Sequence, residues 1–439
     1  MPAPAPTPPA NRFAALLAIA YRRITGHSPS TRTQAALDDF PLYALGSLAA
    51  RVLSLFAQLL VARMLGPEQF GRFSLGLGIA LILAAPLQEA WGAAFVRFAA
   101  IRPAGTTPWH LLRASVLIAA ASTITVVTLA TAGASLLTRW LEIPPDVYRA
   151  GVVTSVAAAT WLAARSACLG VHAWRRMVTI DLGMAVLVLL LPAAMRLFRP
   201  VDSTLLEVFA IAYLVASIPA VPLWWQKPDY PVTPQIRPLW RFGRYLAAAA
   251  ALNSLLLYGD RLIVNHGAGL RALGVYQAYA LSSMTAAMVA SALVNRFLFP
   301  FLNVGDRTAF RKLFRQTLPW LAAVFVPLVV VGGALVVTLL HYPLRPLVLA
   351  VAALAGLALC AMTFLSSLLS TEGERGPRTV LGLQALACTI FFPLAALLVR
   401  WLPLAAPFIA YAVALTVSAS LAYHRLSGGA PLNVNRASE

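Results

Sequence analysis

Charged residues are scarce in this chain of 439 residues: they make up 11% of it, against roughly 25% in a typical soluble domain. Lysine is almost missing, with 2 of the 34 basic residues, and there are only 3 cysteines and 15 acidic residues. Hydrophobic residues make up 60% of the chain, and the mean hydropathy is +0.78. This balance excludes an ordinary soluble domain and indicates a membrane protein.

Several catalytic motifs are missing as well. Neither lysine follows a glycine, so no phosphate-binding loop is present, and neither a His-Glu-x-x-His zinc motif nor a Gly-x-Ser-x-Gly elbow occurs. The cysteines lie in apolar segments without metal-ligand spacing, so we interpret them as small hydrophobic residues. We therefore expect no enzyme activity, no cofactor and no metal site.

Long apolar runs are what the chain has in abundance. Each is long enough to cross roughly 30 Å of hydrocarbon as a helix, and none alternates as a half-buried strand does. The pattern predicts an all-α polytopic membrane protein with about 12 transmembrane helices. The predicted segments lie at 43–64, 73–96, 114–137, 148–170, 178–195, 204–225, 243–266, 275–301, 317–340, 344–370, 379–399 and 402–423.

The net charge of +19 is unevenly distributed along the chain. With the N-terminus inside, 21 basic residues fall on the inner side of the membrane and 8 on the outer side. This excess follows the positive-inside rule, which predicts that both termini are cytoplasmic. Topology and contact with membrane lipids explain the basic balance, so we do not expect a nucleic-acid partner.

Two short segments, at 66–73 and 269–276, resemble each other and lie 203 residues apart. Each has a glycine, a second glycine five residues on and an aromatic residue two further. Glycine tolerates the positive φ that ends a helix, and we expect the aromatic to be an anchor at the membrane interface. A second correspondence, between 93–98 and 292–297, follows in the same order. The repeat predicts two similar lobes, as in many transporters.

A proline-rich stretch at 226–239 separates the first six predicted helices from the last six. Because six is even, both lobes enter the membrane with the same polarity, and a pseudo-two-fold axis along the membrane normal relates them. The run at 13–21 is too short to span; we expect an interfacial helix or an unstructured tail. The predicted organisation is a cytoplasmic tail at 1–42, lobes at 43–225 and 243–424, a cytoplasmic linker at 226–242 and a cytoplasmic tail at 425–439.

Ionisable residues within the predicted helices are the strongest functional signal, because a charge near a helix centre costs roughly 2.5 to 3.5 kcal/mol in the membrane. Arg51 lies in the first helix, and Gln58 shares its face. We interpret Arg51 either as a cavity cation for an anionic headgroup or as half of a structural ion pair. Glu89 in the second helix is predicted to pair with Arg51 or to bind a coupling ion. Arg165 and Asp181 are interpreted as an inner-boundary charge and as a complement to a helix dipole.

The seventh predicted helix carries one polar face, formed by Asn253, Asp260 and Arg261. Adjacent residues point about 100° apart on a helix, so Asp260 and Arg261 do not simply neutralise each other. At least one of them needs a partner elsewhere. For Arg261, snorkelling to the outer surface is the alternative.

The run at 51–73, RVLSLFAQLLVARMLGPEQFGRF, resembles the first hairpin of polysaccharide transporters. These are the O-antigen and capsule flippases of the multidrug and oligosaccharidyl-lipid exporter superfamily. Their helix seven has an Asp-Arg-Leu-Ile pattern and their helix eight begins with Gly-x-Tyr, which 260–263 and 274–276 match here. The resemblance covers 43–100 and 243–302.

This resemblance implies a flippase of the bacterial inner membrane. It would move an undecaprenyl-diphosphate-linked oligosaccharide from the inner to the outer leaflet by alternating access. Arginine suits a diphosphate because its planar guanidinium donates two parallel hydrogen bonds. The predicted substrate-binding residues are Arg51, Gln58, Asn253 and Arg261. The predicted charge partners, or sites for a coupling proton or sodium ion, are Glu89 and Asp260.

Two other classes stay open at this point. A multidrug exporter of the same superfamily would share the helices but favour an acidic, aromatic cavity for cationic drugs. A membrane glycosyltransferase, polymerase or ligase would need a large outer loop, which the short predicted loops disfavour. The sequence gives no indication of the oligomeric state.

Overall fold

The computed structural model describes residues 31–101, 107–195, 202–228, 230–302, 307–370 and 375–428, together with Ala15, Ile19 and Arg22. In this part of the chain every regular element is a helix and no strand occurs, which confirms the all-α prediction. The helices are α2 (Thr31–Ile101), α3 (Trp109–Ala132), α4 (Ala134–Trp140), α5 (Pro145–Gly170), α6 (Trp174–Met195), α7 (Asp202–Ser217), η2 (Ile218–Ala220), α8 (Val221–Trp224), α9 (Thr233–Leu302), α10 (Arg307–Leu339), α11 (Pro346–Ser370), α12 (Arg375–Leu398) and α13 (Ala406–Gly428).

Among the described residues, ten helical segments are long and apolar enough to cross a membrane. Two of them, in α2 and α9, contain 55 and 58 residues. At 1.5 Å per residue each is more than twice as long as the roughly 30 Å hydrocarbon layer is thick. Each therefore crosses twice, which gives the predicted twelve crossings.

The kinks that divide α2 and α9 lie at the two repeated glycines. Gly66 has φ 72° and ψ 175°, and Gly269 has φ 81° and ψ 172°. This region of backbone space is open essentially to glycine alone, and no other glycine of the described residues has a positive φ. The prediction that the repeated glycines end two equivalent helices is confirmed.

The helix α2 begins at Thr31, twelve residues before the predicted start of the first helix. The apolar part of α2 that qualifies as a membrane span begins only at Leu45. The hydropathy pattern thus locates the span but not the polar helical extension before it. The predicted interfacial helix at 13–21 lies outside the described residues except for Ala15 and Ile19.

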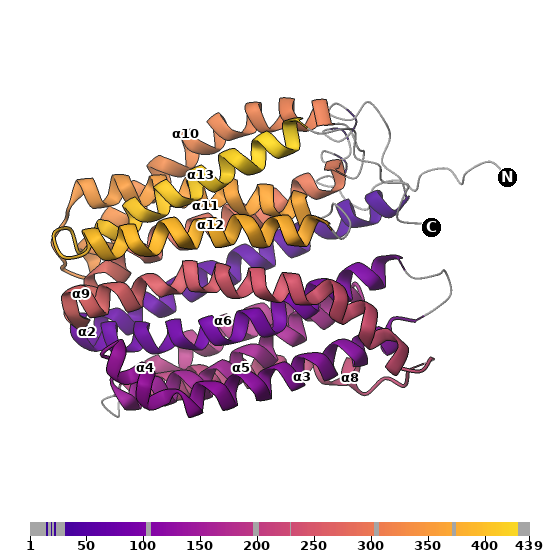
Figure 1. The fold of residues 1–439 in the computed structure, drawn as a ribbon, viewed down its shortest axis with the longest axis horizontal. Helices are drawn as coiled ribbons and strands as arrows, with labels where there is room; N and C mark the ends of the chain where they lie inside the picture. The colour runs from indigo at the N-terminus through magenta and orange to yellow at the C-terminus, as the bar shows by residue number, and fades with distance from the viewer. Residues whose placement is uncertain are drawn as a thin grey trace.

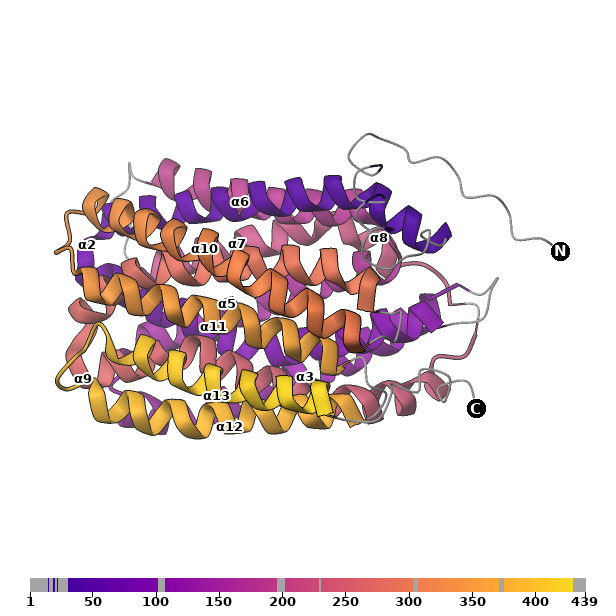
Figure 2. The same ribbon diagram turned by 90° about the horizontal axis from the view of Figure 1, so that it is seen from above.

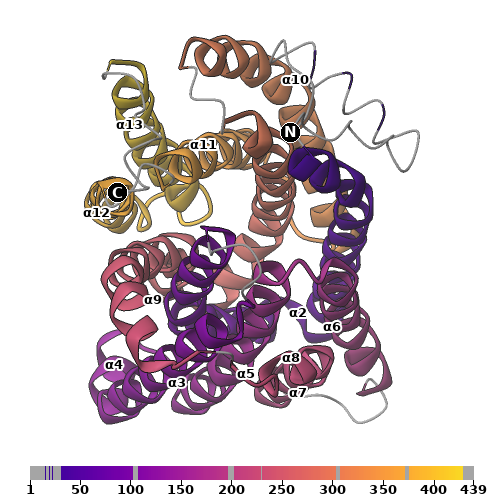
Figure 3. The same cartoon turned by 90° about the vertical axis from the view of Figure 1, so that its right-hand side faces the viewer.

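The helices form two halves that meet along α2 and α9. Figures 1 and 2 show all long helices running in nearly the same direction, and Figure 3 views them end-on. The elements α3 to α8 lie on one side of α2 and α9, and α10 to α13 lie on the other. The described start of α2 and the described end of α13 lie at the same end of the bundle, as an even number of crossings requires (Figure 1).

The aromatic residues of the repeat are buried inside the protein, so the prediction that they anchor the membrane interface is wrong. Phe73 and Tyr276 are 1% and 0% exposed. The Phe73 ring packs edge-on against Phe209, with centroids 5.1 Å apart, and the Tyr276 ring lies 4.9 Å from that of Phe408. In the sequence these two aromatic residues lie just past the turn. Helix packing directs their rings into the lobes, where burial stabilises the protein more than a position at the membrane interface would.

The two glycine hairpins contact each other reciprocally. A Cβ on Gly71 would overlap the carbonyl oxygen of Leu270, and a Cβ on Gly274 would overlap that of Pro67. Neither overlap is possible for a real carbon atom, so the second glycine of each copy allows the backbones to touch. The lobes are closed against each other at this end of the bundle, which we call the hairpin end.

The seam between α2 and α9 is also closed at the opposite end. The rings of Trp91 and Trp240 stack with centroids 5.2 Å apart, and Trp91 covers Gly243. The guanidinium carbon of Arg97 lies 4.5 Å from the centre of the Phe242 ring. The kinks at Gly66 and Gly269 divide each helix into two arms, at 31–66 and 67–101 in α2 and at 233–269 and 270–302 in α9. At this end the second arm of α2 therefore packs on the first arm of α9.

Candidate functional site

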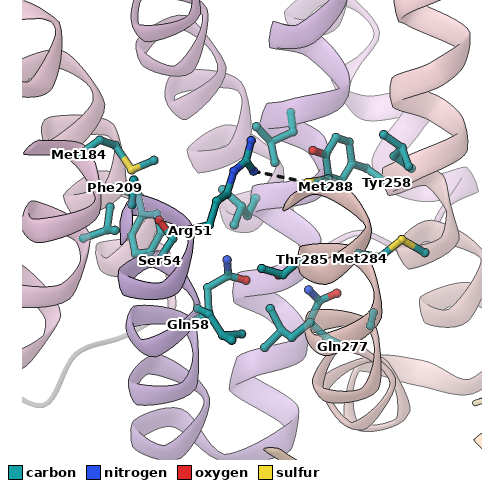
Figure 4. Close-up of a pocket in the computed structure, with 18 of the residues that line it drawn as sticks. Arg51, Ser54, Gln58, Met184, Phe209, Tyr258, Gln277, Met284, Thr285 and Met288 are labelled. Carbon is teal, nitrogen blue, oxygen red and sulfur yellow. Dashed lines mark hydrogen bonds between the residues drawn. The ribbon is translucent and has the colours of Figure 1, made fainter. Parts of the chain in front are cut away.

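A cavity of about 200 Å³ lies between the two lobes. Both arms of α2 and of α9 line it, together with α5, α6 and α7 (Figure 4). Its walls carry hydrophobic, aromatic and amide side chains. The charged side chains that line it are Arg51, Arg165, Asp181, Asp260 and Arg261.

Arg51 reaches across the cavity from the first arm of α2. Its Nη1 atom donates to the sulfur of Met288 on the second arm of α9, at 3.6 Å. A thioether is an uncharged and weak acceptor, so this contact is a weak link between the two lobes. Gln58 lies two helical turns nearer the hairpin end and also lines the cavity, as Figure 4 shows.

Arg261 links the two lobes. Its Nη1 atom donates to the backbone oxygen of Ser74 at 3.1 Å, and its guanidinium carbon lies 5.1 Å from the centre of the Tyr258 ring. The side chain packs on Gly78, where a Cβ would come within 2.9 Å of Cδ. Arg261 is 8% exposed, so it does not snorkel to the surface. Its buried Nε atom has no hydrogen-bond partner.

Asp260 finds its partners within its own lobe. Its Oδ1 atom accepts a hydrogen bond from the backbone nitrogen of Arg261 at 2.7 Å, and its Oδ2 atom accepts one from the Tyr276 hydroxyl at 2.5 Å. The carboxylate is 2% exposed. The expectation that the adjacent Asp260 and Arg261 need other partners therefore agrees with these contacts.

Arg165 and Asp181 form a two-pronged ion pair in the cavity wall. The Arg165 Nε atom lies 2.6 Å from Oδ1 of Asp181, and Nη2 lies 3.1 Å from Oδ2. Sequence reasoning interpreted the two residues separately. The interpretation of Asp181 as a helix-dipole charge is wrong, because α6 begins at Trp174 and Asp181 lies beyond its first turn. The available signal was their similar distance from the turn at 171–173, which places opposite charges at one depth on neighbouring helices.

The structure brings four of the six predicted site residues to the cavity. Arg51, Gln58, Asp260 and Arg261 line one cavity. Asn253 is half-buried in α9, about two turns from Asp260, and is not among the residues that line the cavity. The helix of Glu89 is described, but its side chain lies outside the described residues.

The lobes meet along two seams beside the cavity, one between the second arm of α2 and the first arm of α9 and one between the first arm of α2 and the second arm of α9. The repeat relates these two seams to each other. A shift of 203 residues converts Gln58 into Arg261 and Ser74 into Gln277. On one seam Arg261 binds Ser74 across the lobes. On the other seam Gln58 and Gln277 both line the cavity. Equivalent positions therefore differ in chemistry: an arginine and a serine are joined by a hydrogen bond on one seam, and two glutamines line the cavity on the other.

The cavity offers cationic, amide and aromatic groups to a ligand. Three arginines and two aspartates line it, so it is not an acidic cavity of the kind a cationic drug favours. Within the described residues no cluster of three or more His, Cys, Asp or Glu residues could hold a metal ion. The chemistry that these walls support is binding, with the arginines suited to phosphate oxygens.

Comparisons with known proteins are consistent with this architecture. A protein-family model described as polysaccharide biosynthesis protein matches residues 201–341. No curated protein sequence matches the chain.

Solved structures of multidrug transporters share the arrangement of helices. An inward-facing multidrug resistance MATE family transporter of the MOP superfamily has a TM-score of 0.64 at 13% identity, over 88% of this chain and 98% of that one. A mutant of the Vibrio cholerae MATE transporter VcmN has a TM-score of 0.56 at 16% identity, over 94% and 98%. This chain has the fold of the MOP exporter superfamily. The MATE multidrug transporter DinF-BH has a TM-score of 0.57 at 14% identity, over 96% and 98%.

The two kinds of comparison agree. The fold of the MOP exporters and the polysaccharide biosynthesis match together support membership of the polysaccharide transporter and MOP exporter superfamily. They support a multi-pass membrane protein with a transporter fold.

Proposed function

We propose that this MOP exporter is a flippase for a lipid-linked oligosaccharide on an undecaprenyl diphosphate carrier. The observation that carries the proposal is the cavity between the lobes, which Arg51, Arg165 and Arg261 line. A diphosphate needs such cations, because planar guanidinium groups bind phosphate oxygens with paired hydrogen bonds. The polysaccharide biosynthesis match supports the same substrate class.

We also propose that the protein lies in a bacterial inner membrane with both termini in the cytoplasm. The hairpin end then faces outward, and the described conformation is closed on that side. Export requires the hairpins to part and the cavity to open outward. Moving two negative charges outward across a potential of about 100 mV, negative inside, releases roughly 4 to 5 kcal/mol. The membrane potential alone can therefore drive transport toward the outside. Coupling of transport to a proton or sodium ion that binds at Asp260 is the alternative.

The test compares cells that lack the gene with cells that express the unchanged chain, Arg51→Ala or Arg63→Ala. Arg63 is an exposed arginine on the same arm of α2, so it controls for lost charge. We expect lipid-linked glycan to accumulate on the inner leaflet in the deletion and in Arg51→Ala, but not in Arg63→Ala. Normal distribution of the glycan lipid in the deletion strain would refute the proposed function.

Multidrug export is the competing function, because the solved structures that share the fold include multidrug transporters. The same strains distinguish it. If the deletion makes cells sensitive to cationic dyes while the glycan lipids stay unchanged, the substrate is a drug. We expect the opposite pattern, since the three arginines outnumber the two aspartates of the cavity and a net positive charge disfavours organic cations.

A further inference from the structure

The end of the cavity nearest the hairpins contains an amide group that the protein itself does not satisfy. Gln277 is 4% exposed, and its Oε1 atom has no hydrogen-bond partner. A buried polar atom without a partner costs roughly 1 to 3 kcal/mol. Because Gln277 lines the cavity, a ligand there can supply the missing donor.

The equivalent position in the other lobe carries a different group, because a serine stands there in place of the amide. Ser74, which the repeat relates to Gln277, uses its backbone oxygen to accept a hydrogen bond from Arg261. Gln58, which the repeat relates to Arg261, lies across the cavity from Gln277, and Figure 4 shows both amides at the same level. One seam is thus bridged by a hydrogen bond between the lobes, although Ser74 Oγ and Arg261 Nε have no partner there, and the other seam presents two amides to the cavity.

The chemistry of the unsatisfied atom selects its ligand. An amide oxygen only accepts hydrogen bonds, and the oxygens of an ionised phosphate also only accept. A diphosphate therefore cannot satisfy the Oε1 atom of Gln277, whereas a sugar hydroxyl can donate to it. A second unsatisfied atom, the Nε1 of Trp161, belongs to another cavity residue and can donate a hydrogen bond to an oxygen of a sugar.

The cavity separates the two kinds of group by depth. Arg51 precedes Gln58 by seven residues, which is about 10 Å along a helix. The guanidinium and the amides therefore lie at different levels, as Figure 4 shows. Phe209 of α7, which also lines the cavity, adds an aromatic surface on which an apolar sugar face can pack.

We propose that the Gln58 and Gln277 end of the cavity is a sugar subsite, which holds the first hexose of the lipid-linked glycan while Arg51 binds the diphosphate. This inference rests on the proposed function. Because the two amides come from different lobes, parting of the lobes divides the subsite and releases the sugar.

The test measures binding of two lipids to the purified full-length chain in lipid nanodiscs. One is undecaprenyl diphosphate, and the other is undecaprenyl diphosphate that carries a single hexose. For Gln277→Leu we expect a roughly tenfold weaker affinity for the hexose lipid and an unchanged affinity for the bare lipid. For Arg51→Ala we expect both affinities to fall.

A matched control is Gln384→Leu. Gln384 is 6% exposed and its Oε1 atom also lacks a partner, but it lies in α12 and is not among the cavity residues. This variant should bind both lipids as the unchanged chain does. Equal effects of Gln277→Leu on both lipids, or no effect on either, would overturn the sugar subsite. If the unchanged chain binds neither lipid, the proposed function fails and the subsite fails with it.

Discussion

Gly71 and Gly274 pack against each other's hairpin with no room for a side chain on either residue. A Cβ on Gly71 would lie 3.2 Å from the backbone nitrogen of Gly274, and a Cβ on Gly274 would lie 3.1 Å from that of Gly71. The contact follows the pseudo-two-fold axis of the sequence repeat. It is the point where the lobes must separate for the cavity to open at the hairpin end.

Gly71→Ala or Gly274→Ala should force the hairpins apart, because the added carbon would meet a backbone carbonyl that cannot rotate away. A cysteine at position 74 can report the opening, since Arg261 binds the backbone of Ser74 and not its side chain. We expect several-fold faster labelling of Ser74→Cys by a membrane-impermeant maleimide. Gly183→Ala, at a helical site with open space around it, is the control. Unchanged labelling would show that the hairpin contact does not hold the lobes.

The kink glycines should act through strain rather than through crowding. No atom lies within 4 Å of a Cβ built on Gly66 or Gly269, but their φ values of 72° and 81° disfavour any side chain. Gly66→Ala and Gly269→Ala should each destabilise the protein by about 1 to 3 kcal/mol. Thermal unfolding of the purified chain checks this, with Gly382→Ala as the control. An unchanged melting temperature would contradict the strain.

Arg261→Ala should reduce glycan export at least tenfold while the protein inserts at a normal level. The change removes a buried cation of the cavity and the hydrogen bond that joins α9 to Ser74. Surface polysaccharide and the amount of membrane-inserted protein are the two measurements. Arg271→Ala, an exposed arginine later in α9, should leave both unchanged. Equal export by the two variants would remove Arg261 from the mechanism.

The ion pair of Arg165 and Asp181 should couple the two residues energetically. Their side chains are 22% and 9% exposed, and the pair is held by two contacts. Arg165→Leu or Asp181→Leu alone should cost about 1 to 3 kcal/mol, because each leaves a poorly solvated charge. The double variant should recover much of this loss, which a double-mutant cycle of unfolding midpoints measures. Additive losses would show that the pair is not coupled.

The fold was largely predictable because the membrane acts on the sequence locally. An apolar run in lipid has to satisfy its own backbone and forms a helix, so the number and place of the crossings follow from hydropathy. Gly66 and Gly269 were recognisable because few residues other than glycine adopt their backbone angles. The polar face that carries Asp260 and Arg261 followed from helical spacing alone.

Partners between helices were not predictable in the same way. Arg165 and Asp181 each had a sufficient local explanation, yet packing of α5 against α6 brings them together. The aromatic rings at 73 and 276 stand beside a turn in the sequence, but helix rotation buries them. Asn253 shares a helix with Arg261, but the cavity does not extend to it.

The amino-acid sequence by itself determined a doubled helical membrane protein, its glycine kinks and the polar face that carries Asp260 and Arg261. These properties depend on how each segment meets lipid and on how each residue constrains its own backbone. Only the tertiary structure decided that the second glycines touch, that Arg261 closes one seam, and that Gln58 and Gln277 face a cavity at the other. Those outcomes depend on the rotation and contact of helices far apart in the chain, which side-chain packing between the lobes sets.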